Sequence, residues 1–116
     1  MVASKNPLVR LRHIRDELDA ITEATRGYDR ERYLADYLVR RATERALLIV
    51  SEAVKALPRD LLARYPDTSW FEIANLGNVL RHEYHMVDDE TIWEILSRDL
   101  AELSAVIDRM IEDLAT

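Results

Sequence analysis

Four side chains suited to phosphate chemistry lie within eight consecutive residues of this chain: Asn78, Arg81, His82 and His85. On a helix, the i, i+4 spacing pairs Asn78 with His82 and Arg81 with His85. An imidazole can act as general base or acid near neutral pH, and a guanidinium can stabilise charge on phosphoryl oxygens. The stretch therefore predicts a site that binds and cleaves a phosphodiester.

The same residues also have ordinary structural explanations. A histidine in the last turn of a helix interacts favourably with the helix dipole, which would account for His82 and His85 without any chemistry. Tyr84 can pack its ring and hydrogen-bond its hydroxyl. His13 lies beside an apolar stripe and is interpreted as a packed or half-exposed side chain.

Composition narrows the classes of protein that fit. With 116 residues, 48% of them apolar, the chain is expected to form a single domain over residues 1–116 with its own core. The absence of cysteine excludes disulfides, a thiolate nucleophile and Cys-based metal sites. His82 and His85 with the nearby Asp88 and Asp89 have no second cluster to complete a metal shell, so neither a metal nor another cofactor is expected.

Charge and hydropathy exclude two further classes. The net charge of −6 argues against broad, non-specific binding to duplexes, although it leaves room for a local basic site. No run approaches the roughly 20 apolar residues of a membrane span, and residues 1–12 lack the apolar segment of a signal peptide. The expected location is therefore the cytoplasm, with no membrane partner.

The first half of the chain predicts two long helices. Two Gly and three Pro leave few places for tight turns, which favours an all-α chain. Apolar residues at steps of three and four predict a first helix over residues 8–25, stopped by Gly27, and a second over residues 29–57 that ends before Pro58.

The second half predicts a short helix and two more long ones. The short helix is expected within residues 59–64, before the bend that Pro66 imposes. A capping box from Ser69 to Glu72 should start a helix that runs to about residue 85, and Asp88-Asp89 should start the last one. Four main helices with short connections predict an up-and-down bundle.

Several motifs keep a specific order and spacing along nearly the whole chain. They are Leu11-Arg12-His13-Ile14, Thr25-Arg26-Gly27, the run Glu44–Ala53, Arg64-Tyr65-Pro66, Asn78-Val79-Leu80, His82-Glu83-Tyr84, Val87-Asp88 and Ile92-Trp93. In these motifs the chain resembles HEPN domains of the HepT type, the ribonuclease half of a two-gene toxin–antitoxin module. The resemblance implies a helical homodimer in which an Arg-x(4–6)-His motif cleaves RNA without metal, in a cleft between subunits.

The resemblance also assigns roles to individual residues. The motif histidine corresponds to His82, and the tyrosine two residues later corresponds to Tyr84. In related modules a minimal nucleotidyltransferase silences the toxin by transferring AMP to that tyrosine, which adds negative charge and bulk where RNA must bind. Two-fold symmetry would place two copies of His82 across one cleft, one to take the 2′-OH proton and one to protonate the leaving 5′ oxygen.

The chain departs from the family motif at one position. The motif arginine should lie five residues before His82, where this chain has Gly77. Arg81 is one turn further along on nearly the same face, and helical side chains lean toward the N-terminus. Its guanidinium is therefore expected to reach the space that Gly77 leaves open.

These observations lead to one main hypothesis and one alternative. The main hypothesis is a cytoplasmic, toxin-type endoribonuclease with His82 as acid/base, Arg81 as phosphate-stabilising residue and Asn78 as orienting residue. Tyr84 would be the AMP acceptor, and His85 would contact RNA or cap the helix. The alternative is a catalytically degenerate HEPN dimer that binds the nucleotidyltransferase or a nucleotide without cleaving RNA.

Overall fold

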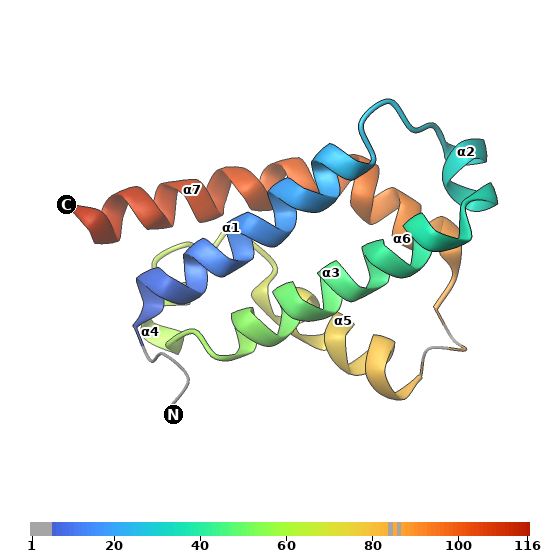
Figure 1. Ribbon diagram of the computed structural model, residues 1–116. Helices are drawn as coiled ribbons and strands as arrows, with labels where there is room; N and C mark the ends of the chain where they lie inside the picture. Colours follow the sequence, from blue (N-terminus) through green and yellow to red (C-terminus); the bar gives the residue numbers. More distant parts are fainter. Residues whose placement is uncertain (1–5, 84, 86) are drawn as a thin grey trace.

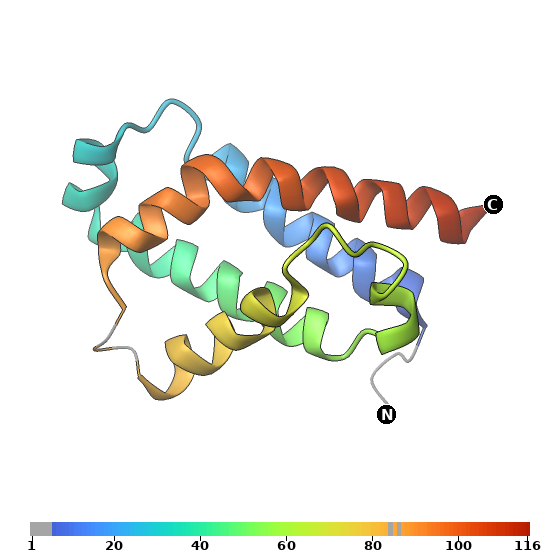
Figure 2. The same cartoon turned by 180° about the vertical axis from the view of Figure 1, so that it is seen from behind.

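The computed structural model describes residues 6–83, 85 and 87–116, and this part of the chain is helical without strands (Figure 1). The elements are α1 (Pro7–Ala24), α2 (Arg30–Ala35), α3 (Tyr37–Lys55), α4 (Arg59–Leu62), α5 (Trp70–His82), α6 (Asp89–Glu94), the π-helical turn η2 (Ile95–Asp99) and α7 (Leu100–Ala115). The continuous α6–η2–α7 segment is the fourth long element, and the four long elements alternate in direction (Figures 1 and 2). The predicted all-α, up-and-down bundle is confirmed.

Helix α1 forms where the apolar spacing predicts it. The side chain of Asn6 caps the helix by accepting a hydrogen bond of 2.9 Å from the amide of Leu8. Pro7 occupies the first turn, where its missing N–H costs nothing. The chain leaves the helix through Gly27, whose φ of 80° lies in the left-handed region that glycine adopts without strain.

The predicted single helix over residues 29–57 is wrong, because the chain breaks at Asp36. This residue has extended backbone angles (φ −107°, ψ 95°) and is at once the C-cap of α2 and the N-cap of α3. Its carboxylate accepts hydrogen bonds from the amide of Val39 at 3.1 Å and from the Tyr28 hydroxyl at 2.7 Å. The cap and the tyrosine together stabilise a bend that the spacing of apolar residues does not predict.

Replacing Asp36 with alanine should lower the melting temperature by several degrees at pH 7, because α3 loses its cap. The hydrogen bond from Tyr28, followed by that from the Val39 amide, lowers the carboxyl pKa below its ordinary 3.8. A lowered pKa stabilises the fold above the unfolded pKa, and the stabilisation is lost as pH falls. The difference between wild type and variant should therefore shrink below about pH 4, as measured by circular dichroism melts.

The control for this experiment is Asp19→Ala, since Asp19 is exposed on α1 and makes no side-chain hydrogen bond within the described residues. This control should melt close to the wild type at both pH values. An Asp36→Ala protein with the same deficit at pH 3 and pH 7 would contradict the assignment.

The hydrophobic core lies between α1, α3 and α7, with α6 extending it toward α2. Its fully buried members come from each of these helices: Leu11, Ile14, Leu18, Tyr33, Val54, Ile92, Ile107 and Met110. Burying aliphatic side chains of this size is the main favourable term in folding. The core therefore ties α3 firmly in place, and α3 in turn is the surface on which α5 packs (Figure 1).

The sequence predicted a side-chain N-cap for each of α5 and α6, and the structure confirms one of the two. Ser69 is the N-cap of α5, but its side chain makes no capping hydrogen bond, so the predicted capping box is wrong. The start is held instead by the Trp70 indole N–H, which donates to the carbonyl of Tyr65 at 3.0 Å. Asp88 caps α6 as predicted, accepting from the amide of Glu90 at 3.0 Å.

Candidate functional site

Helix α5 is fixed on α3 by the hydroxyl of one buried serine. Ser51 Oγ donates to the carbonyl of Ala74 and accepts from the amide of Gly77, each at 2.9 Å. The serine side chain is fully buried, so water does not compete for its hydroxyl. They set the position of α5 along α3 at the residues where the predicted site begins.

The space expected beside Gly77 is filled. A Cβ built on Gly77 would lie 2.3 Å from Ser51 Oγ and 2.8 Å from Ser51 Cβ, closer than real Cβ contacts. Position 77 therefore faces α3 rather than solvent, and the prediction that Arg81 reaches into open space at this point is wrong. The glycine is required by the close approach of the two helices.

Arg81 instead turns toward the surface of α3, where its guanidinium pairs with the carboxylate of Glu52. The next turn of α3 supplies a second cation: Lys55 Nζ lies 2.8 Å from Asn78 Oδ1 and 3.4 Å from Glu52 Oε2. We refer to Glu52, Lys55, Asn78 and Arg81 as the α3–α5 cluster. The side chains of the three charged members are 36–42% exposed, so solvent and ligands can reach them.

The structure places His82 at the exposed end of α5, as the last helical residue. Within the described residues, no hydrogen bond joins His82 to Asn78 or Arg81. His85 is likewise exposed, whereas Tyr84 lies outside the described residues. A single chain therefore brings Asn78 and Arg81 together through α3 and presents His82 beside them to solvent.

Two members of the α3–α5 cluster, Glu52 and Lys55, were not identified from the sequence as site residues. Their i, i+3 spacing indicates only an ordinary ion pair along one helix. Nothing in that spacing connects these residues with α5, where Asn78 lies 23 residues beyond Lys55.

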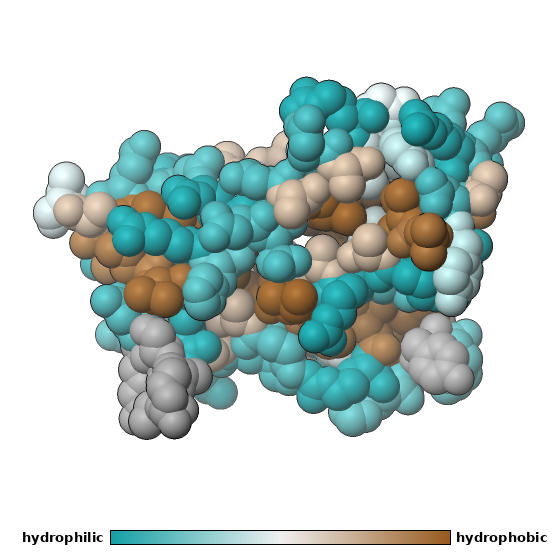
Figure 3. Space-filling model, in the orientation of Figure 1, coloured by the Kyte–Doolittle hydropathy of each residue, from teal (hydrophilic) through white to brown (hydrophobic). Residues whose placement is uncertain are grey.

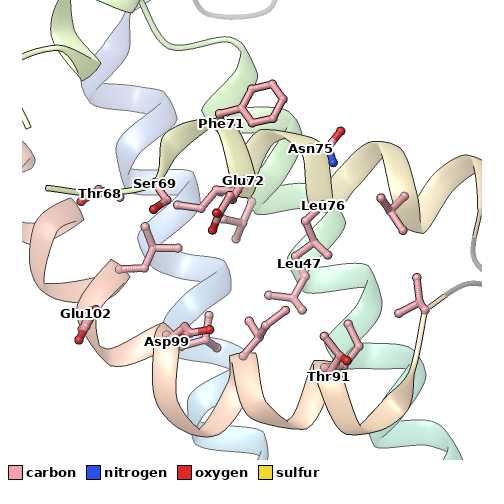
Figure 4. Close-up of a pocket in the computed structure, with 18 of the residues that line it drawn as sticks. Leu47, Thr68, Ser69, Phe71, Glu72, Asn75, Leu76, Thr91, Asp99 and Glu102 are labelled. Carbon is pink, nitrogen blue, oxygen red and sulfur yellow. The ribbon is translucent and has the colours of Figure 1, made fainter. Parts of the chain in front are cut away.

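A cavity of about 530 Å³ lies on another side of α5, between this helix and the α6–η2–α7 segment (Figure 4). Its walls are largely apolar, with leucine, isoleucine and valine side chains from both sides. Five carboxylates line it as well: Asp67, Glu72, Asp88, Asp99 and Glu102. Among the described residues that line it there is no Lys, Arg or His, so the cavity repels a phosphodiester and the α3–α5 cluster is the better candidate.

In the part of the chain that the structure describes, no helix combines the length and the apolar character that crossing a membrane requires. Nor do three His, Asp or Glu side chains gather there in a way that could hold a metal ion.

The structure is thus an all-α bundle that presents histidine, arginine and asparagine at one end of a helix. The family model described as "Ribonuclease HepT-like" matches residues 14–110, and the chain belongs to this family of HepT-like ribonucleases. The resemblance noted from the sequence motifs is thereby confirmed.

Individual relatives cover nearly the whole chain. "Putative RNase TTE0752" of Caldanaerobacter subterraneus is 32% identical over 108 residues, which are 93% of this chain and 96% of that protein. "Probable ribonuclease HepT" of Thermococcus cleftensis is 31% identical over 100 residues, 86% of this chain and 91% of that protein. No solved structure matches the chain. Family and relatives together support a ribonuclease-type function.

Proposed function

We propose that this protein is a metal-independent endoribonuclease of the toxin type, acting as a homodimer in the cytoplasm. The observation that carries the proposal is the exposed end of α5, where the His82 side chain has no hydrogen bond or ion pair within the described residues. His82 follows Arg81 directly and Asn78 by one helical turn, the two residues that α5 contributes to the α3–α5 cluster. An accessible imidazole beside a guanidinium and an ammonium has the parts needed to bind and cleave a phosphodiester.

The chemistry requires a base and an acid. One His82 removes the proton of a ribose 2′-OH, and the resulting oxygen attacks the adjacent phosphorus. The bond from phosphorus to the 5′ oxygen breaks, and the partner subunit's His82 protonates that oxygen, leaving a 2′,3′-cyclic phosphate and a 5′-hydroxyl. Arg81 stabilises the charge that develops on the phosphoryl oxygens, Asn78 orients the phosphate, and His85 contacts the flanking RNA.

Neutralisation by a cognate minimal nucleotidyltransferase is the second part of the proposal. The hydroxyl of Tyr84 would attack the α-phosphorus of ATP, with pyrophosphate leaving, so that AMP becomes linked to the tyrosine. Tyr84 itself lies outside the described residues, but its neighbours Glu83 and His85 are exposed, as an enzyme acting on this segment requires. The added phosphate would repel RNA from His82.

One observation favours the alternative, a dimer that binds the nucleotidyltransferase or a nucleotide without cleaving RNA. Position 77 is buried against Ser51 and carries no arginine, so the family's motif cation is absent from its usual place. If neither Arg81 nor another cation substitutes for it, binding would persist without cleavage.

The experiment that separates the two functions is cleavage of RNA in EDTA by protein whose mass shows no adduct. The expected result is cleavage that leaves 2′,3′-cyclic phosphate ends. A matched substrate with a 2′-deoxyribose at each cleaved position should remain intact, because it lacks the attacking hydroxyl. Failure to cleave single-stranded and structured RNA would overturn the ribonuclease proposal and support the non-catalytic dimer.

A further inference from the structure

Two cations from different helices meet at the exposed edge of the α3–α5 contact. Lys55 comes from the last turn of α3 and reaches Asn78 at 2.8 Å, while Arg81 comes from α5 and reaches back to Glu52. Their meeting depends on Gly77, because the hydrogen bonds between Ser51 and α5 hold the helices at a distance that a side chain at position 77 would prevent.

We propose that Lys55 binds a phosphate of the RNA substrate and, together with Arg81, supplies the positive charge that is missing at position 77. This inference rests on the proposed function and names a residue that the family motif does not include. The site it defines is a two-helix phosphate site, formed by the Lys55 ammonium, the Arg81 guanidinium and the Asn78 amide.

Glu52 gives this site its resting arrangement. Its carboxylate contacts both Lys55 and Arg81, and thereby holds two long, flexible side chains at one place in the absence of RNA. Ion pairs between side chains exposed to this degree contribute little to stability, so a phosphate can replace the carboxylate at small cost. Glu52 is thus a competitor for the phosphate as well as a positioning residue.

Lys55 is a suitable residue to test because the fold does not depend on its side chain. It is exposed on the surface of α3, outside the hydrophobic core, and its described contacts are the polar ones to Glu52 and Asn78. The variants Lys55→Ala and Lys55→Arg should therefore fold, which a circular dichroism melt of each would verify.

The experiment measures RNA binding rather than cleavage. A single-stranded RNA is titrated into the His82→Ala protein, with Lys55→Ala, Lys55→Arg or Arg12→Ala as the second change, over a range of salt concentrations. Arg12 is the matched control, since it is exposed on α1 and has no described side-chain partner. Loss of Lys55 should weaken binding about tenfold. It should also reduce the slope of log affinity against log salt by about 0.7, the contribution of one phosphate contact.

Two further arms test the chemistry of the contact. Lys55→Arg keeps the charge and should restore most of the affinity, while Glu52→Gln removes the competing carboxylate and should tighten binding about threefold. A folded Lys55→Ala protein that binds RNA with the affinity and salt slope of the Arg12→Ala control would overturn the proposal. So would the absence of RNA binding by the folded His82→Ala protein.

The two proposals fail in different ways. If the wild-type chain does not cleave RNA but its affinity depends on Lys55 as expected, the phosphate site is supported and the ribonuclease proposal is overturned. If the chain cleaves RNA and Lys55→Ala alters neither KM nor the salt slope, the ribonuclease proposal is supported and the role of Lys55 is overturned.

Discussion

His82→Ala should lower kcat for RNA cleavage by about 10²- to 10⁴-fold, the usual contribution of a general acid or base. The loss should fall on kcat more than on KM, because the imidazole transfers protons and the cationic side chains bind the phosphate. The fold should be unaffected, since the side chain is exposed. Single-turnover cleavage in EDTA measures the loss in the rate of the chemical step, and a melting curve of each protein measures whether the fold is unaffected.

The matched control is His13→Ala, because His13 is an exposed histidine on α1, away from the α3–α5 contact. This variant should cleave at the wild-type rate. Retention of activity within about threefold by His82→Ala would remove His82 from the mechanism and leave proton transfer to another group.

Gly77→Ala should destabilise the protein by about 1–3 kcal/mol, in the opposite direction to the usual effect of this change within a helix. At an open helical site, alanine is about 1 kcal/mol more favourable than glycine. Here the new Cβ would lie 2.3 Å from the Ser51 Oγ, whose two hydrogen bonds hold it in place. Gly77→Arg, which recreates the family motif, should destabilise more and should not raise activity. Urea denaturation of each variant gives the free energy of unfolding.

The double variant Ser51→Gly with Gly77→Ala tests the cause directly. Removing the serine side chain opens the space, so the cost of Gly77→Ala should become smaller in this background, with a coupling free energy within the range of about 0.5–3 kcal/mol seen for contacting residues. Asn75→Ala controls for helix propensity, since Asn75 is exposed on the same helix. A Gly77→Ala protein as stable as the wild type would contradict the packing argument.

The sequence predicted the parts of the fold that depend on local patterns. The spacing of apolar residues and the glycine at position 27 placed α1 correctly, because both act within one helix. The break at Asp36 was missed because the stripe of apolar residues continues across it. The hydrogen bond that Tyr28 donates to Asp36, eight residues further along the chain, helps to end α2, and no helical spacing indicates this bond.

Only part of the candidate site was predicted, because the sequence again indicates local patterns and not contacts between helices. Asn78, Arg81 and His82 were identified because they lie close together on one segment, and the structure places that segment at an exposed helix end. The contributions of α3 were missed because they depend on how two helices pack. The hydrogen bonds that involve Ser51 and Lys55 span 23 to 26 residues of sequence, and only the fold brings their partners together.

The π-helical turn at Ile95–Asp99 limits which insertions and deletions this family member tolerates. Ile92 and Leu100 are both buried, although eight residues of a uniform α-helix would leave them about 80° out of phase. The wider i to i+5 turn absorbs the surplus residue and brings them onto one face. Deleting one residue within this turn would yield a regular α-helix in which Ile92 and Leu100, then seven residues apart, still share a face. Deleting one residue from the α-helical part between Asp89 and this turn would instead rotate the start of α6 by about 100° relative to α7, which would draw Asp89 away from Arg40, now 3.0 Å distant. A one-residue gap in an alignment at this turn therefore marks a helix without the π-turn, whereas a gap elsewhere in the helix marks a change in how it meets the rest of the bundle.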